Sequence, residues 1–161
     1  MEDITGALGK LQAIFAEKEK VSTDSIKIGD IIKVPLDEED GIIIKDGYET
    51  RDKFIVIVGF TSEGVAVGAL LINSKIDRSK QSSEFLDCQY QLKHADYLSI
   101  LDYDSWLDCS DIFEISKLKI TQRDGRLKGQ LTDEDKERVT EFLIATDVFD
   151  DATKKHFGII N

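Results

Sequence analysis

The chain has 161 residues, a length typical of one domain with room for a short appendage at either end. With 41% hydrophobic and 33% charged residues, its composition is that of a globular protein rather than a disordered one. The 32 acidic residues outnumber the 21 basic ones, and the net charge of −11 disfavours bulk binding to nucleic acid or an anionic membrane, while leaving room for a small basic site.

Two cysteines, Cys88 and Cys109, are too few for a disulfide framework or a zinc cluster. Their apolar neighbours predict two buried free thiols. The first residues lack the basic-then-apolar pattern of a signal peptide, and the apolar stretches 55–60 and 65–72 are far shorter than the roughly 20 residues that span a bilayer. We therefore expect a cytoplasmic protein with no membrane contact, no metal and no other cofactor.

A helix is predicted over residues 2–20, with Asp3 as its cap. Its apolar residues recur at spacings of four, three and four, which places them on one face: Ile4, Leu8, Leu11 and Phe15. This apolar stripe has to be buried either on the chain's own sheet or on another chain.

The first strand pattern runs over residues 26–34, and Pro35 is expected to end it because proline cannot continue a ladder of hydrogen bonds. An acidic loop follows over 36–51. Inside this loop, residues 42–44 are predicted to form a short edge strand. The acidic run 37–40 lacks the alternation, glycine and terminal glutamate of a calcium loop, so we interpret it as solvated.

The strongest strand signal covers residues 53–60 (KFIVIVGF), whose unbroken apolar run predicts burial on both faces or a central place in a barrel. A turn and a second strand over 65–73 follow. Three glycines in this region, Gly59, Gly64 and Gly68, indicate close backbone approach and strong coiling.

The remaining strand patterns are shorter, at 85–92, 105–109 and 112–115. Residues 121–129 are predicted to form a charged turn. Two helices are expected to close the chain: one capped by Thr132, and one over 150–157 ended by Gly158. Short strands with glycine corners and no βαβ alternation predict a mainly β fold, a small bent barrel with peripheral helices.

Three segments together resemble the MazF/PemK family of toxin ribonucleases. They are IGDIIKVP (28–35), RDKFIVIVG with ALLINSKI (51–59 and 69–76), and the long run from Leu107 to Leu143. The last is the most specific, since it follows the family's order of final strand, I-x-x-I piece, basic glycine-containing turn and capped acidic helix. The resemblance predicts a domain over 26–147, with a helical extension at 1–25 and a short helical tail at 148–161.

The resemblance implies an SH3-like barrel that acts as an endoribonuclease. Such proteins cleave single-stranded RNA without a metal, by attack of the 2′-hydroxyl on the adjacent phosphate. The reaction needs a cation to stabilise the phosphorane charge and hydrogen-bonding groups to position the phosphate. The family also implies a homodimer that holds RNA across its groove, and an antitoxin protein as a second partner.

The family places an arginine before a proline and a Thr or Ser at the later turn. Lys53 and Phe54 stand at the first two positions, and Arg51, two residues earlier, faces the same side of the strand as Lys53. Asn73 takes the Thr position, with Ser74 next to it. A lysine point charge in place of an arginine fork implies altered specificity, a slow enzyme or an inactive relative. The resemblance thus assigns these catalytic residues: Arg51, Lys53, Asn73 and Ser74.

Further cations on the same segments are candidate RNA-binding residues. The set comprises Lys75, Arg78, Arg123 and Arg126, with Lys80 and Lys128 as additional cations. Four aromatic residues either stack on bases or pack in the core: Tyr90, Tyr97, Tyr103 and Trp106. The opposing hypothesis is that the cations are solvated strand ends and the chain is an inactive barrel that acts as a protein-interaction module, in which the N-terminal helix docks a partner.

Overall fold

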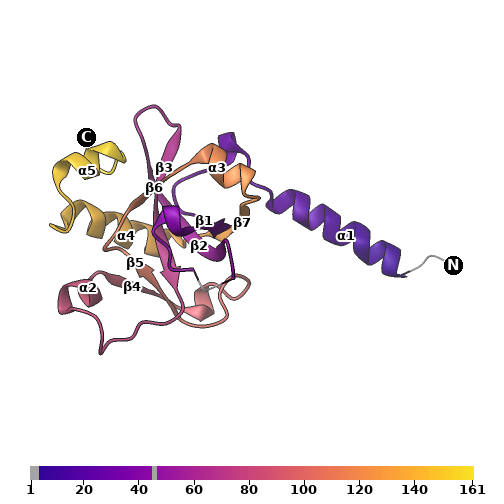
Figure 1. Ribbon diagram of the computed structural model, residues 1–161, viewed down its shortest axis with the longest axis horizontal. Coiled ribbons are helices and arrows are strands. Elements are labelled where there is room, and N and C mark those ends of the chain that lie inside the picture. The colour runs from indigo at the N-terminus through magenta and orange to yellow at the C-terminus, as the bar shows by residue number, and fades with distance from the viewer. Residues whose placement is uncertain (1–3, 45–46) are drawn as a thin grey trace.

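The computed structural model describes residues 4–44 and 47–161, and within them seven strands form one curled antiparallel sheet accompanied by helices (Figure 1). The strand order is β4-β5-β3-β2-β1-β7, and β6 pairs with the first half of β3, whose second half pairs with β5. This confirms the predicted fold class. The strands are β1 (Asp30–Leu36), β2 (Arg51–Phe60), β3 (Ala66–Asn73), β4 (Gln89–Leu92), β5 (Ser105–Asp108), β6 (Phe113–Ser116) and β7 (Arg126–Gln130).

The longest helix, α1 (Ile4–Glu19), points away from the sheet (Figure 1). Leu8 and Leu11 on its predicted apolar face are 54% and 49% exposed. The predicted cap Asp3 lies outside the described residues, as do the side chains of Ile4 and Phe15. Across residues 4–44 and 47–161, no helix combines the length and apolar character needed to cross a bilayer. The other helices are α2 (Ser83–Asp87), α3 (Lys117–Gln122), α4 (Asp133–Ala145) and α5 (Asp151–His156), with short 3-10 turns at Thr23–Ser25 (η1), Glu38–Asp40 (η2) and His94–Asp96 (η3).

The central strands β2 and β3 are buried on both faces, as the apolar run predicts. Ile55 and Ile57 belong to one hydrophobic cluster, with Ile115 and Ile120. Val56, on the opposite face, belongs to a second hydrophobic cluster. This cluster also contains Val139 and Leu143 of α4, and Phe157, which directly follows α5. Strand residues alternate between faces, so one unbroken apolar run supplies two cores.

The predicted glycine corners are confirmed where α5 meets the sheet. A Cβ at Gly59 would lie 2.1 Å from the carbonyl oxygen of Phe157, and one at Gly68 would lie 2.7 Å from the Phe157 ring. The Phe60 amide donates to that same carbonyl at 2.9 Å. The register of β2 against β3 also shifts between Ile57 and Gly59, which adds twist at this point.

Three predictions for the first third of the chain are wrong. The strand predicted from residue 26 begins only at Asp30, after a turn in which the Asp30 amide donates to the Lys27 carbonyl oxygen at 3.1 Å. Pro35 does not end a strand but lies within β1, opposite Asp52. It is tolerated because β7 pairs with β1 only as far as Lys33, so no second neighbour requires an amide from residue 35. Residues 42–44 form no strand; Ile42 is buried while Ile43 is 86% exposed, and neither pairs with the sheet.

The predicted strand over 85–92 and turn over 121–129 are also wrong in part. The segment 85–92 begins inside the helix α2, whose start is capped by the Ser82 hydroxyl, which accepts from the Phe85 amide at 3.1 Å. Only the second half of this segment is the strand β4. The segment 121–129 holds the end of α3 and most of β7, whose five residues are all only partly buried or exposed. A strand without a buried residue carries little hydrophobic alternation, so the sequence pattern resembles a turn.

The C-terminal helices match the prediction. The Thr132 hydroxyl accepts from the Asp135 amide at 3.2 Å, and Gly158 with φ +70° follows α5. Two buried or half-buried tyrosines, Tyr90 and Tyr97, each donate a hydroxyl hydrogen bond of 2.5 Å to the Asp135 carboxylate. These bonds attach the start of α4 to β4 and to the chain after η3. The described cysteines Cys88 and Cys109 are free and buried, as predicted.

Candidate functional site

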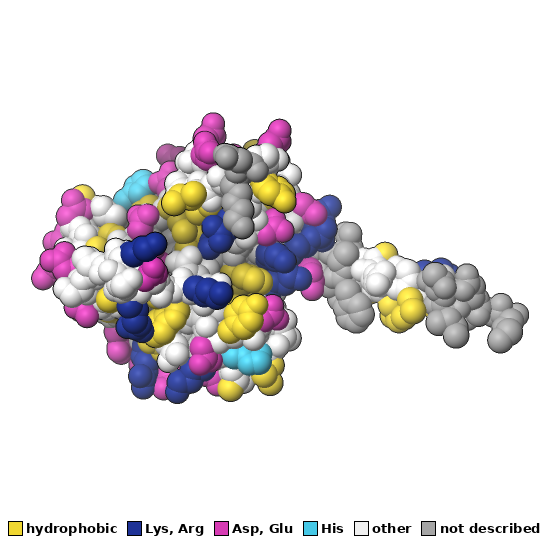
Figure 2. All heavy atoms as spheres, turned by 60° about the horizontal axis from the view of Figure 1, so that its bottom comes forward, with side chains coloured by type: hydrophobic (Ala, Val, Ile, Leu, Met, Phe, Trp, Pro, Cys, Tyr) yellow, Lys and Arg dark blue, Asp and Glu magenta, His cyan; other side chains and the backbone are white. Residues whose placement is uncertain are grey.

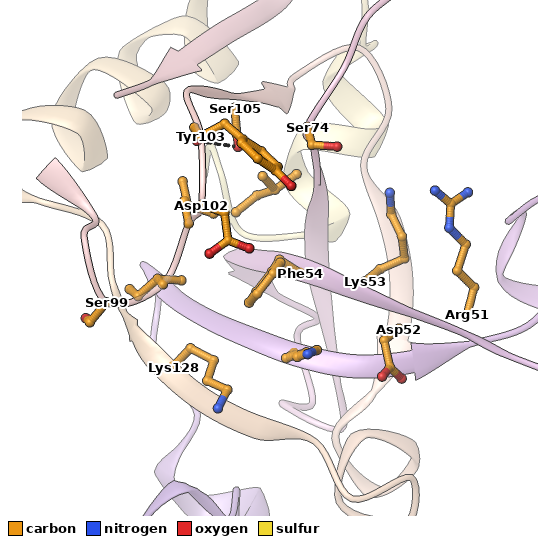
Figure 3. Close-up of a pocket in the computed structure, with 14 residues that line it drawn as sticks. Arg51, Asp52, Lys53, Phe54, Ser74, Ser99, Asp102, Tyr103, Ser105 and Lys128 are labelled. Carbon is orange, nitrogen blue, oxygen red and sulfur yellow. Dashed lines mark hydrogen bonds between the residues drawn. The ribbon is translucent and has the colours of Figure 1, made fainter. Parts of the chain in front are cut away.

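A cavity of about 390 Å³ opens between the sheet and the segment of residues 99–105 that leads into β5 (Figure 3). The sheet side consists of β2 with neighbouring positions of β1, β3 and β7. Its lining holds two acidic residues, Asp52 and Asp102, against four basic ones: Lys33, Arg51, Lys53 and Lys128. Cations therefore outnumber carboxylates in the cavity lining of a chain whose net charge is −11.

Arg51 and Lys53 stand side by side on β2, as their spacing predicts, and both extend their charged ends along the same side of the strand (Figure 3). The Lys53 ammonium donates to the Asn73 side-chain oxygen at 3.0 Å. Burial lowers the pKa of Lys53 from its ordinary value, and the charge of Arg51 lowers it further. A lysine in this state releases its proton more readily than a solvated one.

The end of β3 supplies the hydrogen-bonding groups. Asn73 is held by Lys53 and lies opposite Trp106 of β5, and Ser74 lines the cavity. The structure therefore brings together three predicted catalytic residues, Arg51, Lys53 and Ser74, and holds the fourth, Asn73, against Lys53. The predicted RNA-binding residue Lys75 is exposed next to them. Arg78 lies with its guanidinium 5.1 Å from the centre of the Trp106 ring.

Two further cations reach the cavity from the neighbouring strands. Lys33 of β1 lies opposite Phe54, and its ammonium is 5.7 Å from the centre of that ring. Lys128 of β7 forms an ion pair of 2.8 Å with Glu19 at the end of α1. Figure 2 shows one face of the molecule on which several Lys and Arg side chains lie, with Asp and Glu side chains among and around them.

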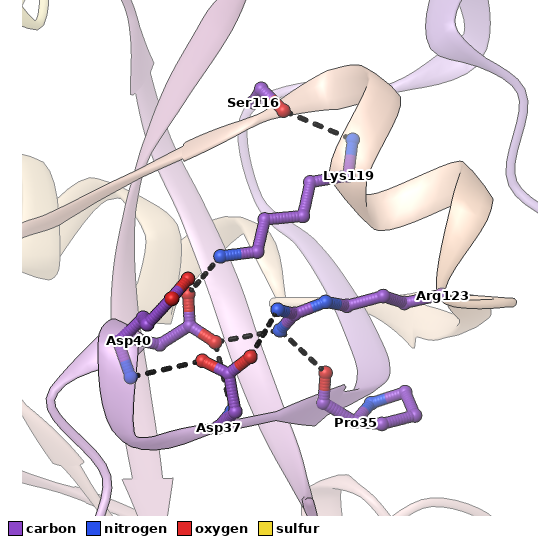
Figure 4. A network of polar contacts seen from close by, with 7 residues as sticks. Pro35, Asp37, Asp40, Ser116, Lys119 and Arg123 are labelled. Carbon is purple, nitrogen blue, oxygen red and sulfur yellow. Dashed lines mark hydrogen bonds and ion pairs between the residues drawn. The ribbon is translucent and has the colours of Figure 1, made fainter.

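Two predicted RNA-binding arginines lie elsewhere, engaged with carboxylates. Arg123 donates to Asp37 and Asp40 at 2.6 Å each, and to the carbonyl oxygen of Pro35 at 3.2 Å (Figure 4). The prediction that the acidic run 37–40 is solvated is therefore wrong for Asp40, whose side chain is only 4% exposed. Burial lowers the pKa of Arg123, but the hydrogen bond and charge of Asp40, together with Asp37, raise it more. Arg126 pairs with Asp124 at 2.8 Å. Neither arginine is among the described residues that line the cavity.

Sequence patterns missed part of the cavity lining. Lys33 alternates with the buried Ile32 and Val34, which was a usable signal that it faces away from that core cluster. Of the four aromatic candidates, the structure places Tyr97 in the core and Tyr103 on the cavity. Asp102 and Ser99 carried no signal, because their position depends on how a long connection folds back over β2.

No protein-family model and no curated protein matches this chain. In the described part of the chain, no group of three or more His, Cys, Asp and Glu side chains is arranged to hold a metal ion. The side chains at the cavity supply positive charge from lysine and arginine, and hydrogen bonds from Ser74 and the Lys53–Asn73 pair.

Proposed function

We propose that this protein is a MazF/PemK-like endoribonuclease of SH3-like fold that binds single-stranded RNA in the cavity and cleaves it without a metal. The observation that carries the proposal is the Lys53 ammonium, bonded to Asn73 at 3.0 Å beside Arg51 on the cavity wall. Positive charge and hydrogen bonds aimed at one point are what a phosphorane requires. The sequence segments that resemble the family supply the same residues.

In the proposed reaction the 2′-oxygen forms a bond to phosphorus while the bond from phosphorus to the 5′-oxygen breaks. The proton of the 2′-hydroxyl passes to solvent, and the departing 5′-oxygen is protonated by Lys53, whose lowered pKa suits an acid. Arg51 stabilises the charge on the phosphoryl oxygens, and Ser74 holds one of them by a hydrogen bond. The products are a 2′,3′-cyclic phosphate and a 5′-hydroxyl end.

The direct test is incubation of purified protein with a long single-stranded RNA in EDTA, followed by chemical mapping of the new ends. We expect cyclic phosphate ends from the wild type and a loss of roughly 10²-fold or more in rate for Lys53→Met. Lys155→Met is the matched control, because Lys155 is exposed on α5 and outside the cavity. Absence of cleavage by the wild type, or equal rates for wild type and Lys53→Met, contradicts the proposal.

The family resemblance extends the proposal to partners. We propose a homodimer whose two cavities share one RNA path, and an antitoxin protein whose acidic segment covers the cations of the cavity. Native mass spectrometry of the chain alone tests the dimer. Competition between an acidic peptide and RNA, measured with Lys53→Met alongside, tests the antitoxin surface. The cytoplasmic location that the sequence predicts is part of the same proposal.

A second candidate function, a non-catalytic interaction module, is favoured by the state of α1. Its apolar residues Leu8, Leu11 and Ile14 are each about half exposed, at 54%, 49% and 51%. A helix that presents this surface fits a role in docking another chain. If the module is the function, deletion of residues 1–20 changes the assembly state and RNA is left intact by every variant.

A further inference from the structure

We propose that Asp102 and Tyr103 form a base-binding subsite within the cavity and select guanine in the RNA strand. This inference rests on the proposed function, because it names the base that accompanies the phosphate on Arg51 and Lys53. Its evidence is separate, however. It comes from the connection between β4 and β5, which lies outside the segments that resemble the ribonuclease family.

Charges of both signs line the cavity: four cations, Lys33, Arg51, Lys53 and Lys128, and two carboxylates, Asp52 and Asp102. Arg51 and Lys53 stand on one side, while the Asp102 carboxylate and the Tyr103 ring point into the cavity from the other (Figure 3). A phosphate is attracted to the first side and repelled by Asp102. A nucleotide laid across the cavity therefore places its phosphate on the cations and its base against Asp102 and Tyr103.

The Asp102 carboxylate has an open hydrogen-bonding capacity. Within residues 4–44 and 47–161 it forms no hydrogen bond and no ion pair, although it lies on a wall facing cations. An ionised carboxylate only accepts hydrogen bonds, through two oxygens. A ligand group with two adjacent donors fits it best.

Tyr103 provides a flat apolar surface beside that acceptor. The residue is 61% exposed, so its ring is available to a ligand. Stacking on an aromatic ring is worth roughly 10- to 100-fold in affinity per base and tolerates every base, so Tyr103 supplies binding rather than selection. Selection then falls to Asp102.

The segment that carries both residues is held in place before a ligand arrives. At its start, the amides of Ile100 and Leu101 donate to the carbonyl oxygen of Tyr97 at 3.0 and 2.9 Å. At its end, the His94 amide donates to Asp104 at 2.8 Å, and the hydroxyl of the buried Ser105 donates to the carbonyl oxygen of Tyr103 at 3.0 Å. A fixed backbone reduces the entropy lost on binding and sharpens discrimination between ligands.

The donor pattern of the four bases decides which one fits. Guanine presents N1–H and N2–H₂ side by side on its pairing edge, a match for both carboxylate oxygens. Cytosine and adenine present one amino group each. Uracil presents a single N3–H between two carbonyl oxygens, which a carboxylate repels. The expected order of affinity is guanine first and uracil last.

The test uses four fluorescent five-residue RNAs of sequence UUNUU, with 2′-O-methyl sugars throughout so that no 2′-hydroxyl is left to attack. Their affinities are measured by anisotropy at low salt. For wild type we expect the guanine strand to bind roughly 10-fold or more tightly than the uracil strand. Asp102→Asn should bring the two within about 3-fold, because its amide offers a donor to uracil. Tyr103→Ala should weaken all four strands alike.

The matched control is Asp111→Asn, which removes the same charge at an exposed position outside the cavity and should keep the guanine preference. Equal affinity of wild type for all four strands overturns the base subsite and leaves the proposed function standing. The same holds if the preference survives in Asp102→Asn. Failure of wild type to bind any strand overturns both. Thermal unfolding of each variant verifies that it is folded, and these surface changes should not shift it measurably.

Discussion

Two groups of cations in this protein differ in what neutralises them. Arg123 and Lys119 form ion pairs with Asp37 and Asp40, and the Asp40 side chain is only 4% exposed (Figure 4). Arg51 and Lys53 form no ion pair with a carboxylate anywhere in the described ranges, and the partner of Lys53 is the neutral Asn73. The first group holds the acidic turn η2 against α3. The second leaves positive charge directed into a cavity.

The difference shows that a count of cations in the sequence does not locate a binding surface. Arg123 satisfied the same sequence criterion as Arg51, yet its charge is already used within the fold. A cation whose carboxylate partners are buried beside it contributes to stability. One that is left with neutral neighbours is available to an anionic ligand. Substitutions in the first group should therefore lower stability and leave RNA affinity nearly unchanged, whereas substitutions in the second group should lower RNA affinity and leave stability unchanged.

The largest expected effect is on stability, from Arg123→Met. This change leaves the buried Asp40 with Lys119 as its remaining cation, and we expect a loss of about 3 kcal/mol in the free energy of unfolding, measured with urea. RNA affinity should change less than about 2-fold, since Arg123 does not line the cavity. Arg138→Met on α4 breaks an exposed ion pair and should cost less than about 0.5 kcal/mol. A loss of RNA affinity in folded Arg123→Met would contradict the assignment of Arg123 to the structural cations.

The converse profile is expected for Lys53→Met. The affinity for single-stranded RNA should fall roughly 10-fold, because a phosphate loses a charged hydrogen bond. The free energy of unfolding should not fall, since the folded state disfavours the charged form of Lys53. If this variant unfolds as easily as Arg123→Met, Lys53 belongs with the structural cations.

A third prediction concerns the stability of the protein at acidic pH. Burial raises the pKa of Asp40, but its hydrogen bonds with Lys119, the Asp37 backbone and Arg123 lower it from 3.8 to about 2. The folded form holds this carboxylate ionised, so its stabilising contribution is complete above pH 3.8 and disappears as the pH falls to about 2. Asp40→Asn should be less stable at neutral pH and should lose less stability across that window. An identical acid profile for wild type and Asp40→Asn contradicts this assignment.

The smallest effect is expected at alkaline pH. The pKa of Lys53 is lower in the folded protein than its ordinary value of 10.5, so unfolding takes up a proton between the two values. Wild-type stability should therefore rise relative to Lys53→Met as the pH rises through this interval. Chemical unfolding of both proteins across that range measures it, and parallel curves would show that Lys53 titrates as in the unfolded chain.

The parts of the fold that the sequence predicts are those with local signals. The apolar run of β2, the Thr132 cap and the close-packed Gly59 are each encoded by a few adjacent residues. Strand β7 has no buried side chain that a hydrophobic pattern could reveal, and the tolerance of Pro35 within β1 depends on where the distant β7 ends. These features are decided by tertiary neighbours.

The same distinction holds for the cavity. The pairing of Arg51 with Lys53 follows from strand periodicity, and the contact between Lys53 and Asn73 follows from the β2–β3 hairpin. The Asp102 and Tyr103 wall is built by a connection whose course no short-range pattern specifies. The separation of Arg123 from the cavity depends on an acidic turn more than 80 residues away in sequence, as its bonds to Asp37 and Asp40 show.

The most direct test of the central claim, that Arg51 and Lys53 hold an RNA phosphate, is the salt dependence of RNA binding. A plot of log affinity against log salt has a slope of about −0.7 for each phosphate neutralised on a single strand. The double variant Arg51→Met/Lys53→Met removes both cations from one phosphate and should reduce the steepness of this slope by about 0.7, while Arg123→Met leaves it unchanged. An unchanged slope in the folded double variant would show that the cavity cations do not contact RNA.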